Sequence, residues 1–177
     1  MKKTGILNQV HKGLKVWLFE TGTKIQQTDF SNVSEGQSTV KELQELMRSL
    51  DRKAFLENQY FLPALALTAP YIVSIVEEEN KQLKDLSSRL NKKLEHYLLP
   101  GTDGHYSSSG QFIQQAFIEF LSFILMYMNR QESLFSGLGT HDNETGMFSL
   151  NNLADAHAME LAEWMLKGMN NREISEW

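Results

Sequence analysis

Four long apolar stripes, each with helical spacing, constrain the fold of this chain more than any other feature. They run within residues 6–25, 40–65, 72–94 and 113–138. Apolar residues that recur every three or four positions lie on one face of an α-helix, because the helix turns once per ~3.6 residues. The sequence shows neither an alternating strand pattern nor an internal repeat of ~20 to 50 residues. The stripes therefore predict an all-α fold.

Polar residues lie within or beside each of these stripes. They are His11 in the first stripe, Lys53 and Glu57 in the second, Asn80 in the third, and Tyr127 and Gln131 in the fourth. Helices that share one core bring such residues toward one another, and helical bundles build internal sites in this way. We therefore expect these side chains to form one internal polar cluster.

Turn-forming residues divide the chain into predicted helices. Four main helices are expected at about 6–27, 35–66, 70–99 and 109–138, with C-terminal helices at about 150–169 and 171–177. Pro63 should kink or end the second helix because proline lacks an N–H group and clashes with the preceding turn. Short connections make successive helices antiparallel. The prediction is one domain over 1–177, an antiparallel up-and-down four-helix bundle whose additional helices cover one side or end.

Composition excludes several classes of function. A chain of 177 residues is long enough for one well-filled core. Its formal net charge of −5 argues against a nucleic-acid partner or an acidic membrane surface. The chain has no cysteine, which excludes disulfides, thiol catalysis, iron–sulfur clusters and thiolate zinc sites. His, Asp and Glu are therefore its strong metal ligands.

The N-terminal region also bears on localisation. It begins with two lysines, but polar residues at 8–12 interrupt the apolar segment that a signal peptide requires. No uninterrupted apolar run approaches the ~20 residues of a transmembrane helix. We therefore expect a cytoplasmic protein without a membrane partner.

Three segments resemble a known family. Residues 8–14 (NQVHKGL), 26–32 (QQTDFSN) and 164–174 (WMLKGMNNREI) resemble bacterial hemerythrin-like proteins, and the resemblance covers nearly the whole chain. Only the region from about 140 to 150 is shorter than in that family. The resemblance implies an up-and-down four-helix bundle. Complete members hold two iron atoms between histidines and carboxylates, and they bind or sense oxygen or handle nitric oxide and iron.

The family's metal motif can be carried over position by position. It consists of one His on the first helix, His-x3-Glu on the second, one His on the third and His-x3-Glu on the fourth. His11 and Glu57 match this motif. The other four ligand positions hold different residues, namely Lys53, Asn80, Tyr127 and Gln131. The resemblance thus implies a hemerythrin-like site that keeps two of its six ligands.

These replacements predict a different kind of site. Two iron ions need several imidazoles and carboxylates, whereas Lys53 places a cation where a cation would bind. Lys53 and Glu57 are four residues apart, a spacing at which helical side chains meet. We expect a buried ion pair whose polar neighbours complete the hydrogen bonds. The alternative is that Lys53 extends to solvent and Glu57 is half exposed.

Other interpretations concern single residues. His11 by itself is more often a satisfied core histidine than a ligand. A weak mononuclear metal site on His11 and Glu57, completed by Tyr127 or water, is the alternative. Glu132 is one residue away from the ligand register and close to Arg130 in sequence, so we interpret it as a surface residue.

Two further polar clusters lie near the C-terminus. Residues 141–144 (HDNE) resemble a loop cation site but lack the required alternation of oxygen ligands, which favours a solvated turn. Asp155, His157 and Glu160 lie in one predicted helix, and no second cluster would make a dinuclear site with them. Neither cluster predicts a metal centre.

The predicted function follows from these observations. The sequence contains no phosphate loop, nucleophile elbow or Ser/His/Asp arrangement, so we expect no enzyme. The hypothesis is a bundle without a cofactor that acts as a binding or regulatory module for a small molecule or a protein. The alternative is a metalloprotein that handles iron, oxygen or nitric oxide through a reduced site.

Overall fold

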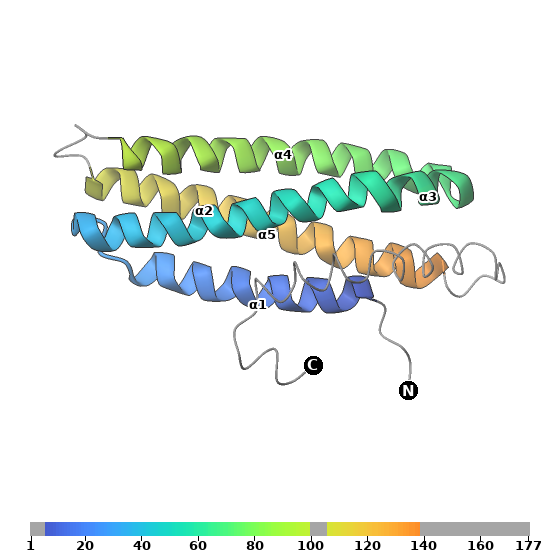
Figure 1. The fold of residues 1–177 in the computed structure, drawn as a ribbon, viewed down its shortest axis with the longest axis horizontal. Helices are drawn as coiled ribbons and strands as arrows, with labels where there is room; N and C mark the ends of the chain where they lie inside the picture. Colours follow the sequence, from blue (N-terminus) through green and yellow to red (C-terminus); the bar gives the residue numbers. More distant parts are fainter. Residues whose placement is uncertain (1–5, 100–105, 139–177) are drawn as a thin grey trace.

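The computed structural model describes residues 6–99 and 106–138, and these are almost entirely helical, with no strand among them (Figure 1). The elements in chain order are α1 (Ile6–Gln27), α2 (Val33–Leu56), a π-helical segment η1 (Glu57–Phe61), α3 (Leu62–Thr68), α4 (Pro70–Leu98) and α5 (Tyr106–Leu138). The predicted all-α class is confirmed for these residues. The helices predicted beyond residue 138 lie outside the described part of the chain.

Four helical columns pack side by side, and α2, η1 and α3 together form one of them (Figure 1). α1 packs against α2 and α5, and α4 packs against the same two helices. The inward faces of the columns therefore enclose a shared apolar core. Its buried side chains include Leu18, Ile25, Val40, Leu43, Leu90, Leu94, Phe117 and Phe120.

The helix bounds lie close to those predicted from turn residues. The second helix begins at Val33 rather than near residue 35, because Asn32 caps it. The Asn32 side-chain oxygen accepts a hydrogen bond from the Glu35 backbone N–H at 3.3 Å. This bond satisfies one of the free donors in the first helical turn.

Pro63 does not end the second helical column, which continues to Thr68. The residues just before it form the π-helical segment η1, where the Leu62 backbone N–H donates to the Glu57 carbonyl five residues earlier. A π-turn is wider than an α-turn. The wider turn makes room for a proline ring that would clash with the preceding turn of a regular α-helix. The helix therefore passes through Pro63.

Two aromatic side chains, Phe30 and Tyr97, close one end of the bundle. The Phe30 and Tyr97 rings meet edge to face, with centroids 5.6 Å apart. The Tyr97 hydroxyl also donates to the Phe30 carbonyl oxygen at 3.1 Å. These contacts join the α1–α2 turn to the last turn of α4. The opposing backbone positions are glycines, Gly36 against Tyr97 and Gly110 against Phe30.

The stretch Ser108–Leu134 of α5 is the one segment within 6–99 and 106–138 that is long and apolar enough to cross a membrane. Length and composition alone are weak support for a membrane span, because the core helix of a soluble protein meets the same criteria. Here Phe117, Phe120 and Ile124 pack in the main core. The inward face of α5 thus accounts for part of its apolar character, whereas Phe112, Ile118 and Met126 are exposed.

Candidate functional site

The side chain of Lys53 lies inside the bundle, and only 6% of the residue is exposed. Its Nζ pairs with Oε1 of Glu57, which is also buried. Nζ lies 3.3 Å from Oε1 of Gln131 and 5.3 Å from the centroid of the Tyr127 ring. The expected buried ion pair is therefore present, and the alternative in which Lys53 extends to solvent is wrong.

Tyr127 is the centre of the hydrogen bonds around this ion pair. Its hydroxyl donates to Oδ1 of Asn80 at 2.6 Å and accepts from Nε2 of Gln131 at 2.6 Å. Oε2 of Glu57 lies farther from the hydroxyl, at 3.3 Å. Burial raises the pKa of Tyr127, and the negative charge of Glu57 raises it further. Tyr127 is therefore a neutral phenol at any ordinary pH.

His11 is fully buried, and its two ring nitrogens have different surroundings. Its Nδ1 lies 3.0 Å from Oε1 of Glu132. A carboxylate accepts hydrogen bonds, so Nδ1 carries the proton and Nε2 presents a lone pair. This Nε2 has no hydrogen-bond partner in the structure. His11 is thus only half satisfied.

The charge state of His11 follows from its surroundings. Burial lowers its pKa to about 2, and the nearby ammonium groups of Lys53 and Lys15 contribute in the same direction. The side chain of Gln131 raises the pKa of His11, but by less. His11 is therefore a neutral imidazole at physiological pH. It neither adds to the positive charge of Lys53 nor competes with it for Glu57.

Glu132 is not the surface residue that the sequence predicted. Its side chain is only 29% exposed, and it accepts hydrogen bonds from His11 and from Lys15 at 2.7 Å. Lys15 also donates to Oδ1 of Asn129 at 2.9 Å. Glu132 follows the inward-facing Gln131 by one position, so its side chain points toward α1 instead of toward solvent. The partner of Glu132 is therefore on α1, and it is not Arg130.

Arg130 pairs with Glu79 of α4. Glu79 is 6% exposed, and its Oε2 has no hydrogen-bond partner. Burial raises the pKa of Glu79, and the charge of Arg130 lowers it. Sequence analysis missed this buried carboxylate, although its position three residues after the buried Val76 was a usable signal.

Asn80 connects the polar cluster to the edge of the bundle. Its Oδ1 accepts from Tyr127, and its Nδ2 donates to Oδ1 of Asn58 at 3.2 Å. Asn58 is exposed and lies in η1. All six residues that the sequence singled out therefore lie in or beside one cluster. Asn58, Lys15, Asn129, Glu79 and Glu132 extend it.

The donor groups of this cluster do not fit a pair of iron ions. Within residues 6–99 and 106–138, no group of three or more His, Asp or Glu side chains converges as a metal site would require. Glu57 is paired with Lys53, and the Nδ1 of His11 is bound to Glu132. The clusters at residues 141–144 and 155–160 lie outside the part of the chain that the structure describes.

No family model, curated protein or solved structure matches this chain. The resemblance to hemerythrin-like proteins therefore remains a prediction from the quoted sequence segments.

Proposed function

We propose that this chain is a hemerythrin-like antiparallel bundle that works without a metal or other cofactor, as a binding or regulatory module of the cytoplasm. One observation carries the proposal, namely the buried ion pair between Lys53 and Glu57 at the centre of the polar cluster. An ammonium on the protein itself supplies the positive charge that a metal ion supplies elsewhere. The cluster thereby retains its attraction between opposite charges with no bound ion.

The protonation states of the cluster support a role without catalysis. A general acid or base works best with a pKa near the operating pH. The pKa of His11 is lowered to about 2, and the pKa of Tyr127 is raised. Neither group exchanges protons readily near neutral pH. The cluster therefore acts as a structural core for surfaces that bind a small molecule or a protein.

A reduced metal site is the second candidate, and one observation favours it. Nε2 of His11 presents a buried lone pair that has no partner, and a lone pair of this kind is what a metal ligand offers. Glu57 would have to release Lys53 to serve as a further ligand. Lys53 would then repel the incoming cation, so such a site would be weak.

Iron binding tests this proposal directly. The purified protein should hold well under one equivalent of iron after anaerobic addition of ferrous ion, with no oxygen-dependent absorption in the near ultraviolet. The measurements are metal analysis and an optical spectrum. Stoichiometric binding of two irons by the unmodified chain would contradict the proposal.

A restored variant tests the hemerythrin-like geometry separately. It carries four substitutions: Lys53→His, Asn80→His, Tyr127→His and Gln131→Glu. This variant should gain iron binding, because all four positions face the cluster that contains His11 and Glu57. A control with Lys84→His and Gln111→Glu places the same residue types at exposed positions and should gain none. A restored variant that folds but binds no iron would contradict the proposed geometry.

A further inference from the structure

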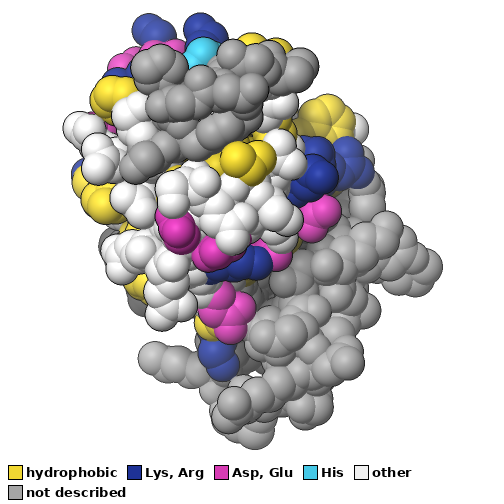
Figure 2. All heavy atoms as spheres, turned by 90° about the vertical axis from the view of Figure 1, so that its left-hand side faces the viewer, with side chains coloured by type: hydrophobic (Ala, Val, Ile, Leu, Met, Phe, Trp, Pro, Cys, Tyr) yellow, Lys and Arg dark blue, Asp and Glu magenta, His cyan; other side chains and the backbone are white. Residues whose placement is uncertain are grey.

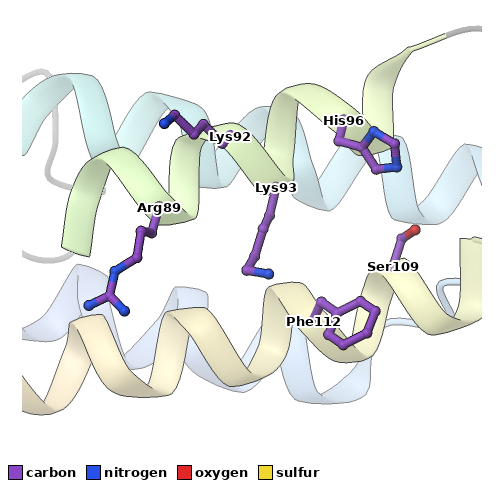
Figure 3. A pocket seen from close by; sticks show the side chains of 6 residues that line it. All are labelled: Arg89, Lys92, Lys93, His96, Ser109 and Phe112. Carbon is purple, nitrogen blue, oxygen red and sulfur yellow. The ribbon is translucent and has the colours of Figure 1, made fainter. Parts of the chain in front are cut away.

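A second polar feature lies between the last turns of α4 and the first turns of α5 (Figure 3). It is a surface pocket of about 350 Å³, within the range of small-molecule sites. Its lining residues are Arg89, Lys92, Lys93 and His96 of α4, and Ser109 and Phe112 of α5. None of them belongs to the polar cluster around Lys53. The pocket is therefore a separate site.

The four α4 residues lie along one face of the helix, because their spacing of three, four and seven residues brings them to the same side. Three of them, Arg89, Lys92 and Lys93, carry positive charge. Figure 2 shows Lys or Arg side chains and a His side chain near the end of α4, with Asp or Glu side chains beside them. Within residues 6–99 and 106–138, no carboxylate forms an ion pair with Arg89, Lys92 or Lys93. The exposed Lys41, Lys81 and Lys84 also have no such partner, but they do not line the pocket. The pocket thus concentrates uncompensated charge in a chain of net charge −5.

An aromatic ring forms the opposite wall. Phe112 is 57% exposed, and the Nζ of Lys93 lies 5.1 Å from its ring centroid. Arg89 and Lys93 extend from α4 toward α5, where Phe112 lies beside Lys93, whereas Ser109 lies near His96 at the other end of the pocket from Arg89 (Figure 3). The pocket therefore combines anion-binding donors with a flat apolar surface.

We propose that this pocket binds a small molecule in which a phosphate group is joined to a flat aromatic ring, as in a mononucleotide. The phosphate would accept hydrogen bonds from the guanidinium of Arg89 and the ammonium of Lys93. The aromatic ring would stack on Phe112.

Lys93 couples binding of the ligand's phosphate to binding of its aromatic ring. In the free protein its ammonium lies over the Phe112 ring, a weak contact at an exposed position. A phosphate offers this ammonium a stronger, charge-assisted hydrogen bond. When Lys93 moves to the phosphate, it uncovers the ring face for stacking. Binding of the phosphate and binding of the aromatic ring therefore assist each other.

Calorimetric titration of the full chain with AMP, adenosine and inorganic phosphate tests the proposal. We expect AMP to bind one site with a Kd of roughly 0.1 to 1 mM. Phosphate should bind about tenfold more weakly than AMP, since it lacks the ring. Adenosine should bind more weakly still, because the basic residues have no anion to contact. The site does not involve the Lys53 cluster, so this result is independent of the iron experiments.

Substitutions divide the site into its two halves. Lys93→Gln and Arg89→Gln should each weaken AMP binding about tenfold, whereas Lys84→Gln at an exposed position of the same helix should leave it unchanged. Phe112→Ala should reduce AMP affinity to that of phosphate and leave phosphate binding intact. Phe19→Ala removes an equally exposed ring from α1, 55% against 57%, and should have no effect.

Four outcomes would overturn the proposal. The first is that the unmodified chain does not bind AMP, and the second is that Lys84→Gln and Lys93→Gln weaken AMP binding equally. The third is that inorganic phosphate binds as tightly as AMP, and the fourth is that a single-stranded oligonucleotide binds more tightly than AMP at equal phosphate concentration. The third would remove the aromatic part of the ligand, and the fourth would point to a polynucleotide. Unchanged denaturation midpoints would show that the variants, all at partly or fully exposed positions, remain folded.

Discussion

Two regions of the bundle are held together differently. At the end that contains Phe30 and Tyr97 the helices are joined mainly by packed aromatic rings, whereas in the polar cluster around Lys53 they are joined by an ion pair and hydrogen bonds. At the aromatic end, shape decides which residues fit, and glycines leave room for the rings. In the polar cluster, each side chain depends on a partner from another helix or another turn. A substitution at the aromatic end should therefore disturb only the packing around it. A substitution in the polar cluster should leave a buried charge or hydrogen-bond donor without its partner.

The largest expected effect is that of Lys53→Met. Removal of the ammonium leaves Glu57 buried without its partner, and breaking a buried pair in this way costs ~3 to 5 kcal/mol. Chemical denaturation should show this loss of unfolding free energy. Lys53→Met combined with Glu57→Gln should recover much of it. If both variants unfold like the parent, the ion pair contributes nothing.

An exposed ion pair provides the matched control for Lys53. Lys24 pairs with Glu42, and their side chains are 43% and 50% exposed. Exposed pairs contribute ~0 to 1 kcal/mol, so Lys24→Met should lower the unfolding free energy by no more than ~1 kcal/mol. Similar losses at the two sites would remove the distinction between the buried and the exposed pair.

Gly110→Ala tests the aromatic end. A methyl group at this position would lie 2.3 Å from Cγ and 2.4 Å from Cβ of Phe30, too close for the ring to rotate away. Overpacking of this kind costs ~1 to 3 kcal/mol. In the control Gly22→Ala, the nearest atom is Cε1 of Phe117 at 3.2 Å, and the helix-propensity gain of ~1 kcal/mol offsets the strain. Equal denaturation midpoints for the two variants would refute the prediction.

His11 should make stability depend on pH. Its pKa is about 2 in the folded chain and 6.5 in the unfolded chain. The unfolded state therefore binds more protons, and the stabilisation is present above pH 6.5 and lost as the pH falls toward 2. At pH 5 the loss should reach about 2 kcal/mol relative to pH 7. In the His11→Gln variant this part of the pH dependence should disappear. If the parent and the variant lose unfolding free energy equally between pH 7 and pH 5, the prediction is wrong.

Tyr127→Phe should have the smallest effect on the polar cluster. The substitution keeps the ring but leaves Nε2 of Gln131 and Oδ1 of Asn80 without the hydroxyl. An unsatisfied buried group costs about 1 to 3 kcal/mol, and we expect the lower end because Asn80 is only partly buried. Thermal melting at neutral pH would measure the loss. A variant as stable as the parent would show that water replaces the hydroxyl.

The helices and the core of the cluster could be predicted because apolar periodicity determines which face of a helix is buried. Lys53 and Tyr127 interrupt that periodicity, so they were identified from sequence. The pairing of His11 with Glu132 was missed, because it depends on how α1 and α5 are rotated and offset along their axes. Periodicity contains no information on either quantity. Arg130 and Glu79 were missed for the same reason.

Pro63 shows a different limit of sequence reasoning. The sequence predicted that Pro63 would kink or end the second helix but did not decide between the two outcomes. An end of the helix would require a regular α-helical turn before the proline, and η1 does not meet that requirement. A one-residue change in the hydrogen-bond pattern was sufficient to remove the conflict. Nothing in the sequence before Pro63 distinguishes a π-turn from an α-turn.

The π-helical segment also sets the phase of the second column. Glu57 and Leu65 are both buried although they are eight residues apart, a separation that rotates a regular α-helix about 80° away from alignment. A π-turn absorbs one residue without rotating the helix beyond it. The two residues are then effectively seven apart and about 20° from alignment. The second column thus contains one extra residue, which the π-turn accommodates. We expect that deletion of one residue within η1 would keep the residues before and after it on the same buried face, and would place Pro63 in a regular α-helix.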